Sequence, residues 1–315
     1  MGKFLIKRLG QSLGVLFIVT VLVFGVLHLM PGDPIQIYLG ETATPEQIEI
    51  YTREFGLDRP VFIQYIRWIG GLFQGNMGMS IVFRVPVVDI IPQRIRTTLT
   101  LTIPAFVFAT ITGIFLGVAA AKNRNRFIDS AISVFANLGI ATPTFWIGMI
   151  VVYIFSLRLN ILPVQGFVPL TENFGESVRR LVLPVFVLSL GQIASITRQT
   201  RSAMLEVISQ DYIRTARSKG LKEGNITFFH ALRNAMIPIV TLLGGSVGRL
   251  VGGTVIMENL FVIPGMGSLM ITAINNKDYM VVQNVVFIMA LFIVICNLIV
   301  DILYGYVDPR IRVEE

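Results

Sequence analysis

Few side chains in this sequence are of the types that perform chemistry. Its 315 residues include one cysteine, Cys296, and two histidines, His28 and His230, which lie far apart in the chain. One cysteine cannot build a disulfide framework or a thiolate metal cluster, and two distant histidines do not suggest a metal site. The sequence has no GxxxxGK(S/T) phosphate-binding segment and no evident pairing of a nucleophile with a base. We therefore expect a non-catalytic chain that binds no metal and no cofactor of its own.

An arginine inside an apolar run is the best candidate for a functional side chain. Arg249 lies within Ile237–Val262, where a charge is costly and marks either a functional site or a buried pair that stabilises the helices. Glu258 would point away from it on the same helix. Gly244, Gly248 and Gly252 recur at every fourth position and form one smooth face for helix contact. The candidate functional residues inside the apolar runs are Arg249, Gly245, Gly248, Gly252 and, from an earlier run, Asn137.

The composition places these residues in a membrane protein. The chain is 54% hydrophobic and only 14% charged, with a mean hydropathy of +0.72. A soluble domain has about 25% charged residues, so this chain has too few to cover a water-facing surface. The net charge of +7 comes from basic residues between apolar runs. That distribution is typical of membrane topology rather than of nucleic-acid binding, so we expect no nucleic-acid partner.

Six apolar runs could cross a bilayer, which takes roughly 20 helical residues. They are Leu13–Met30, Leu99–Ala121, Ala131–Leu157, Leu181–Ile196, Ile237–Val262 and Val281–Tyr304. The first could be a signal peptide, but HLMPGDP follows it instead of a small-x-small cleavage site, which favours a retained helix. Pro184 and Gly191 interrupt the fourth run, so we expect that helix to be broken. The predicted fold class is an all-α integral membrane protein with about six transmembrane helices.

Basic residues predict the orientation of these helices. With both termini in the cytoplasm, the inner segments hold more lysine and arginine than the outer ones. Most outer basic residues lie in the loop after the first helix, which is longer than about 60 residues, and the positive-inside bias does not apply to loops of that length.

The long outer loop carries its own helix signals. The sequence TPEQ at 44–47 is typical of a capping box with proline at the first helical position, and Gly56 provides a stop. A second segment, Val61–Phe73, has the aromatic content of a helix in the headgroup region. This loop is either a lid that packs on the transmembrane helices or a platform for an extracytoplasmic partner.

A polar, basic segment interrupts the apolar runs at Asp211–Pro238, with the sequence DYIRTARSKGLKEGNITFFHALRNAMIP. We call it the basic segment. Asp211 can cap a helix that Gly220 ends, and Ile226–Asn234 is predicted to form a second helix. A short helix with small residues on one face suits a groove on another protein, whereas the alternative is a solvated basic loop.

The basic segment resembles the EAA-type coupling loop of ABC importer permeases, and more narrowly that of the B-type permease of the dipeptide/oligopeptide/nickel importer family. Arg214 occupies the glutamate position of the general loop and Arg233 its proline position, as is typical of this subfamily. The resemblance covers nearly the whole chain. It includes MPGDP (Met30–Pro34), GLDRP (Gly56–Pro60), GNMGMS (Gly75–Ser80), PTFWIG (Pro143–Gly148), LPVQG (Leu162–Gly166), ENLFVIPGMGSL (Glu258–Leu269), NNKDYMVVQ (Asn275–Gln283) and NLIVDILYGYVDPRIR (Asn297–Arg312).

This resemblance implies a type I ABC importer permease fold. Its expected parts are an N-terminal transmembrane helix at 1–30 and a partly helical extracytoplasmic loop region at 31–95. A core permease domain of five helices follows at 96–306, with a cytoplasmic coupling loop at 202–236, and a cytoplasmic tail at 307–315.

The resemblance also implies partners in a prokaryotic inner membrane. They are a second permease of the C type, two ABC ATPases that use ATP and Mg²⁺, and an extracytoplasmic binding protein that delivers di- or oligopeptides. Nickel complexes or glutathione are alternative substrates. A secondary transporter is a more distant alternative, which would be expected to show an internal inverted repeat. The residues implied in ATPase coupling are Asp211, Tyr212, Arg214, Thr215, Ala216, Arg217, Lys219 and Gly220. The candidates for lining the transport pathway are the residues named above, Arg249, Gly245, Gly248, Gly252 and Asn137.

Overall fold

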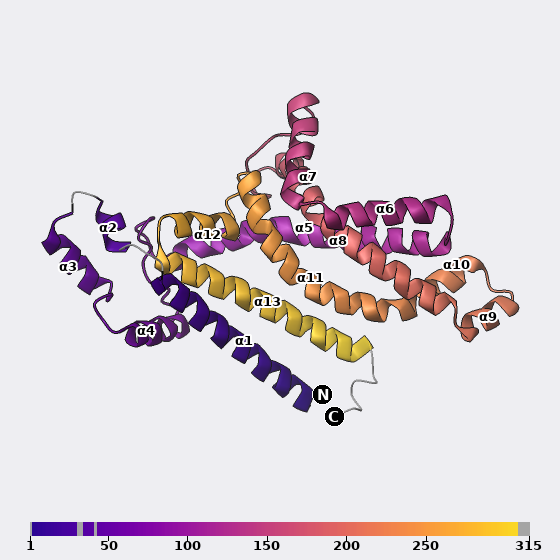
Figure 1. Cartoon of the computed structure of the whole chain (residues 1–315), viewed down its shortest axis with the longest axis horizontal. Helices are drawn as coiled ribbons and strands as arrows, with labels where there is room; N and C mark the ends of the chain where they lie inside the picture. The colour runs from indigo at the N-terminus through magenta and orange to yellow at the C-terminus, as the bar shows by residue number, and fades with distance from the viewer. Residues whose placement is uncertain (1, 30–33, 41–42, 308–315) are drawn as a thin grey trace. The chain divides into compact units, whose positions relative to one another are not determined.

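The computed structural model describes residues 2–29, 34–40 and 43–307. The predicted tail after Val307 and most of the Met30–Pro34 motif lie outside these residues. Within them the regular structure is helical, apart from one isolated antiparallel bridge between Met79 and Pro86 (Figure 1). The chain divides into two compact units. Unit 1 comprises Met1–Leu9, Leu99–Ile263 and Ile295–Glu315, and unit 2 comprises Gly10–Thr98 and Pro264–Val294.

Five helices are long and apolar enough to cross a membrane. They are α1 (Gly2–Leu29), α5 (Val87–Lys122), α8 (Phe174–Ile208), α11 (Arg233–Leu260) with the short helical turns before it, and α13 (Tyr279–Val307). A sixth span is obtained if a bent helix pair is counted as one. The prediction of about six transmembrane helices is confirmed in this form.

The bent pair replaces the single helix that we predicted over Ala131–Leu157. Helix α6 (Phe127–Ala141) stops at Thr142, and α7 (Thr144–Val152) continues into a π-helical segment, η1 (Tyr153–Arg158). The two halves meet at 104°. The cause is Pro143, which has no N–H to donate and excludes Thr142 from the helical region, so Thr142 is extended with φ −90° and ψ 130°. The run predicted as one span is therefore divided into two helices at Pro143.

Helix α8 is continuous, and the predicted break in it is wrong. It runs for 35 residues with Pro184 in its interior. An interior proline costs a helix about 3 kcal/mol, but here Leu183, Pro184, Val187 and Leu188 are all buried in the core of unit 1. Burial of one such aliphatic side chain contributes about 1.5–3 kcal/mol, so packing offsets the local cost.

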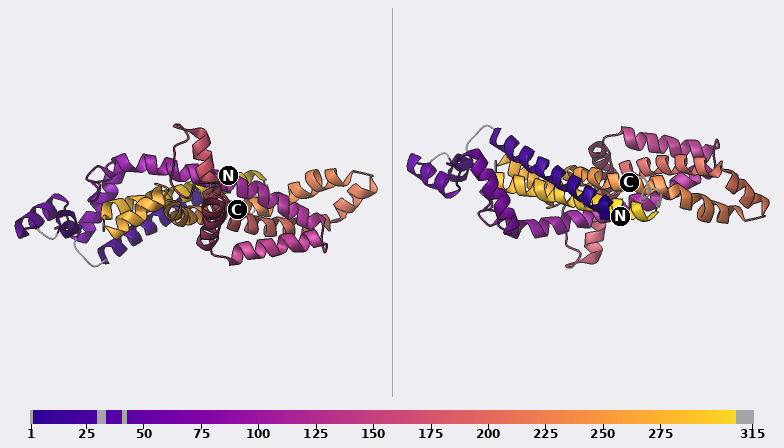
Figure 2. Two further views of the ribbon diagram at one scale, coloured as in Figure 1. Left: turned by 90° about the horizontal axis from the view of Figure 1, so that it is seen from above. Right: turned by 90° about the horizontal axis from the view of Figure 1, so that it is seen from below.

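Unit 1 is organised around α8, which packs against α6, α7 and α11. Helices α6 and α8 run side by side (Figure 1 and Figure 2). Helix α5 also approaches α8 closely, because a Cβ at Gly117 would lie 2.4 Å from the Cβ of Thr200. The main core of the unit contains Leu101, Ala105, Val151, Leu181, Val187, Leu250, Met257 and Phe261.

Unit 2 contains the loop that was predicted to be extracytoplasmic, and the helix signals of this outer loop are confirmed. Thr44 and Gln47 form the capping box at the start of α3 (Pro45–Glu54), and Gly56, with φ +68°, follows its end. Helix α4 has the predicted bounds, Val61–Phe73. The remaining helices of the unit are α2 (Pro34–Leu39) and α12 (Met266–Asn275). Because α5 already begins at Val87, the last residues of the predicted loop region, 31–95, belong to a spanning helix.

Two buried polar contacts join the outer loop to α13 and to Asp278, the residue before it, within unit 2. The indole Nε1–H of Trp68 donates to Oδ1 of Asn284 at 3.3 Å. The carboxylate of Asp278 accepts hydrogen bonds from Ser80 Oγ at 2.5 Å and from the backbone N–H groups of Val82 and Val281 at 3.1 and 3.2 Å. Helix α13 also lies beside α1 in this unit (Figure 1 and Figure 2). The outer loop is thus packed on the ends of spanning helices.

Candidate functional site

The first half of the basic segment forms helix α9 (Asp211–Ser218). Its N-cap is Gln210, with an extended backbone at φ −74° and ψ 149°, so the prediction that Asp211 is the cap is wrong by one position. Asp211 lies in the first turn instead, where its negative charge is favourable at the helix N-terminus. Gly220 has φ +79° and ends the helix as predicted.

The second half of the basic segment is continuous with the next spanning helix. Helix α10 (Glu223–Asn225), the π-helical turn η2 (Ile226–Leu232) and α11 follow one another without a break, and together they make a helical stretch of 38 residues, Glu223–Leu260. The prediction of a separate helix at Ile226–Asn234 is therefore wrong, because the helix runs on through Pro238. One helical stretch thus begins in the basic segment and continues through the apolar part of the chain.

Helix α9 presents one face to the chain's own core. Ile213 and Ala216 are buried in a cluster with residues of α5, α8 and η2, including Val118, Met204 and Ile226. Ala216, which was predicted to seat a partner, therefore faces inward. The other seven predicted coupling residues are exposed, namely Asp211, Tyr212, Arg214, Thr215, Arg217, Lys219 and Gly220.

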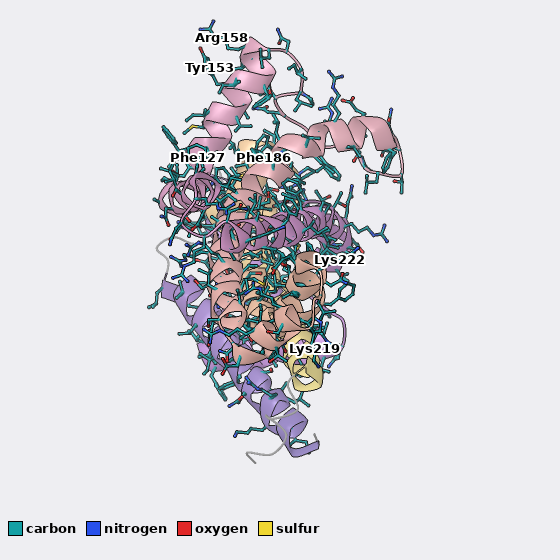
Figure 3. The ribbon with its side chains drawn as sticks, turned by 90° about the vertical axis from the view of Figure 1, so that its right-hand side faces the viewer. Phe127, Tyr153, Arg158, Phe186, Lys219 and Lys222 are labelled. Carbon is teal, nitrogen blue, oxygen red and sulfur yellow. The ribbon has the colours of Figure 1, made fainter. Side chains whose placement is uncertain are left out.

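Polar contacts fix α9 against the helix that follows it. Arg217 Nε donates to Glu223 Oε1 at 2.8 Å across the turn at Gly220. Nδ2 of Asn234 donates to the hydroxyl of Tyr212 at 2.9 Å. The sequence predicted no role for Glu223 or Asn234, because neither contact follows helical spacing. Lys219 and Lys222 lie on this turn, well separated from Tyr153 and Arg158 of η1 (Figure 3).

A cavity of about 250 Å³ lies in unit 1 where the break between α6 and α7 meets α8 and α11. We call it the central cavity. Arg249, predicted to line a pathway, is one of its lining residues. The others are Gly139, Ile140, Thr142, Thr144, Leu188, Gly191, Gln192, Ser195, Leu250 and Gly253.

The other predicted pathway residues lie outside the lining of the central cavity. Asn137, Gly245 and Gly252 are exposed and Gly248 is half-buried. A Cβ at Gly245 or Gly252 would meet no atom within 4 Å, whereas one at Gly244 would lie 2.5 Å from Val300 of α13. The predicted smooth glycine face is therefore divided between a helix contact and open surface.

The polar residues of the cavity were missed from the sequence, except Arg249. Gln192 is 6% exposed, and its Nε2 donates to the carbonyl of Ser246 at 3.1 Å. Its Oε1 is buried without a hydrogen-bond partner among the described residues. Gln192 and Ser195 lie on a spanning helix, where polar side chains are rare and usually functional, and that signal could have found them. In the part of the chain that is described, Arg249 makes no ion pair or hydrogen bond.

Within the described ranges, no group of three or more His, Cys, Asp or Glu side chains is placed to hold a metal ion.

Comparison with known families gives matches over both parts of the chain. Residues 113–313 match the family described as binding-protein-dependent transport system inner membrane component. Residues 1–102 match the corresponding N-terminal family of these membrane components.

Individual relatives align over almost their full length. The chain is 38% identical to a probable peptide ABC transporter permease protein of Sinorhizobium fredii, covering 99% of this chain and 100% of that protein. It is 40% identical to the dipeptide transport system permease protein DppB of Escherichia coli K12, with 99% of each chain covered.

A solved structure shares the fold. It is a chain of the MetNI methionine ABC transporter in an inward-facing conformation, with a TM-score of 0.57 and 17% identity, and the match covers 70% of this chain and 96% of that one. With the two family matches, which together span almost the whole sequence, this places the protein: it belongs to the binding-protein-dependent transport system inner membrane components, the permease subunits of ABC importers.

Proposed function

We propose that this chain forms one half of the translocation pathway of an ATP-driven importer for di- or oligopeptides. An extracytoplasmic binding protein would deliver the peptide, and a second permease of the C type would complete the pathway. The relatives reported above are named for peptide and dipeptide transport, which favours peptides over nickel complexes or glutathione. ATP and Mg²⁺ would be used by two partner ATPases, so this chain is a non-catalytic subunit.

One observation carries the proposal, namely the helical stretch Glu223–Leu260. In this stretch, Glu223 bonds to Arg217 of α9 and Asn234 bonds to Tyr212 of α9. Further along the same stretch, Arg249 lines the central cavity. A displacement of α9 by an ATPase would therefore move α11 with it as a rigid body. The buried face of α9 at Ile213 and Ala216 transmits the same displacement to α5 and α8.

The exposed residues of α9 would form the surface that docks on the ATPases. They include an acidic first turn and a basic end, from Asp211 to Lys219. Charges at such a rim set the register and rate of association more than the affinity. On this proposal both termini and the basic segment are cytoplasmic, and α3 and α4 lie on the outer side, where the binding protein docks.

Reconstitution of the complete importer in proteoliposomes tests the proposal. With both permeases, both ATPases and the binding protein present, we expect uptake of a radiolabelled dipeptide that requires ATP. Omitting this chain should abolish uptake. Uptake by this chain alone without ATP would identify a secondary transporter, and uptake of a nickel complex but no peptide would reassign the substrate.

A further inference from the structure

The first residue of a helix lines the wall of the central cavity. Helix α7 begins at Thr144, directly after the 104° bend. The first N–H groups of a helix have no acceptor within it and carry a partial positive charge. The N-cap residue of α7 is Pro143, which provides no side-chain acceptor. Thr142 and Thr144, on either side of this start, both line the cavity. Broken helices in transporters direct such N-termini at anionic groups of the substrate.

The side chains that line the cavity also carry a positive charge, like the start of α7. Arg249 is the one charged residue among those that line it, and no carboxylate of the described chain shares the lining. Arg249 also has no ion-pair partner within the described residues. A guanidinium group prefers a planar anion that accepts two parallel hydrogen bonds, as a carboxylate does. The helix start and the arginine together select a ligand with a carboxylate.

Gln192 lines the same cavity as these two positive groups and carries a buried acceptor. Oε1 of Gln192 has no donor among the described residues, although the rest of the amide is fixed by Ser246. An unpaired buried carbonyl oxygen costs about 1–3 kcal/mol, so a ligand that brings an N–H group gains from satisfying it. In a peptide, the nitrogen of the last backbone N–H is bonded directly to the carbon that bears the terminal carboxylate.

The size of the cavity restricts what it can hold. At about 250 Å³ it is smaller than the 300–1,000 Å³ or so of sites that enclose a drug-sized molecule. It therefore suits one end of a ligand rather than a whole oligopeptide. Gly191 and Gly253 keep its wall free of side chains, and a Cβ at Gly191 would meet nothing within 4 Å.

We propose that the central cavity binds the free C-terminus of the transported peptide. The carboxylate would pair with Arg249 and the start of α7, and the last peptide N–H would donate to Oε1 of Gln192. These groups are common to all unmodified peptides, so the site would recognise peptides without reading their side chains. This inference rests on the peptide-import function proposed above and names a subsite for it.

The test compares a dipeptide with its C-terminal amide, which keeps the N–H and lacks the negative charge. Initial ATP-dependent uptake is measured in proteoliposomes that hold the complete importer, with the binding protein loaded to equal occupancy with either peptide. The wild-type importer should transport the acid about tenfold faster or more, the discrimination expected from hydrogen bonds to a charged group. Arg249→Gln should slow the acid far more than the amide, so that the ratio of acid to amide rates falls to about one. Arg249→Lys should give a ratio between those of the wild type and Arg249→Gln.

Arg124→Gln is the matched control. It removes the same charge from an exposed residue outside the cavity lining, and it should keep the wild-type ratio of acid to amide. Equal rates for acid and amide in the wild type would overturn the inference even if Arg249→Gln failed to fold. An equal slowing of both peptides in Arg249→Gln would also overturn it, since that is the effect of a structural arginine. Absence of any peptide uptake by a wild-type importer that hydrolyses ATP would instead overturn the proposed function.

Discussion

Asp129 near the start of α6 and Arg201 on α8 form an ion pair with two hydrogen bonds. Nε and Nη2 of Arg201 lie 2.6 and 2.8 Å from the two carboxylate oxygens of Asp129. The Asp129 side chain is 6% exposed and also accepts a hydrogen bond from the backbone N–H of Asn125 at 3.1 Å. This pair joins one helix that borders the central cavity to the helix that leads into the basic segment.

Removal of one partner from this pair should destabilise the protein strongly. Arg201→Met leaves the Asp129 carboxylate buried without its counter-charge, which costs about 3–5 kcal/mol in a fully buried pair. Because the Arg201 side chain is 29% exposed, we expect about 2 kcal/mol. Thermal unfolding of the purified protein measures this loss, and the double variant Asp129→Asn with Arg201→Met should recover part of it.

Arg214→Met is the control for that experiment. Its pairing with Asp211 is long, at 3.6 Å, and its side chain is 77% exposed. We expect no measurable change in its unfolding temperature. Equal losses in Arg201→Met and Arg214→Met would contradict a stabilising role for the buried pair.

The close approach of α5 and α8 gives a second prediction. Gly117→Ala would place a Cβ 2.4 Å from that of Thr200 and 2.8 Å from the carbonyl of Thr197. Because the backbone of α8 must then move, we expect a loss of about 1–3 kcal/mol, as in overpacked cores. Gly14→Ala, on α1 with nothing within 4 Å, should be neutral or stabilising because alanine favours the helix. Similar unfolding temperatures for the two variants would show that α5 and α8 do not pack this closely.

Local signals in the sequence predicted the local structure well. The capping box at Thr44 and the bounds of α4 depend on neighbours within one helix, and both are confirmed. Pro143 and Pro184 are positions where neighbouring residues in the sequence do not predict the outcome. Both residues disfavour a helix, yet the chain bends at Pro143 and stays helical through Pro184, which is buried among α8's core residues. Tertiary packing decides between these outcomes, and spacing in one sequence does not reveal it.

The candidate site depends still more on contacts that one sequence does not show. Asp129 and Arg201 are 72 positions apart, and Gln192 and Ser246 are 54 apart. Arg249 was predicted because a charge in an apolar run is conspicuous by itself. Ala216 was predicted to face a partner, but it is buried, because one small residue on a short helix is compatible with either face.

The turn at Gly220 gives a third prediction, which concerns coupling. Gly220 has φ +79° and a Cβ there would meet nothing within 4 Å, so its backbone conformation alone requires glycine. Gly220→Pro forces φ to about −65° and should break the turn between α9 and α10. We expect transport to be uncoupled from ATP hydrolysis while the protein still inserts in the membrane. Measurements of peptide uptake and ATPase activity by the same proteoliposomes test this.

Alanine substitutions at two glycines distinguish the need for a positive φ at Gly220 from a general effect of replacing glycine in this turn. Gly220→Ala should reduce uptake partially, because a left-handed conformation costs alanine about 1 kcal/mol. Gly224→Ala, in helix α10 with no atom within 4 Å of the new Cβ, should behave as wild type. Normal uptake by Gly220→Pro would count against a coupling role for this turn.

The last prediction concerns whether Arg217 acts within the chain or on a partner. Its bonds to Glu223, at 2.8 and 3.5 Å, hold α9 against α10. Both side chains are about half exposed, 45% and 59%, so loss of the pair should change stability by less than about 1 kcal/mol. We nevertheless expect Arg217→Glu to lower uptake, because two like charges would then push α9 away from the helix that it must move. Exchanging the two residues, Arg217→Glu with Glu223→Arg, restores the attraction and should restore uptake. If the exchanged protein remains as impaired as Arg217→Glu while its unfolding temperature is normal, the arginine acts instead through direct contact with the ATPase.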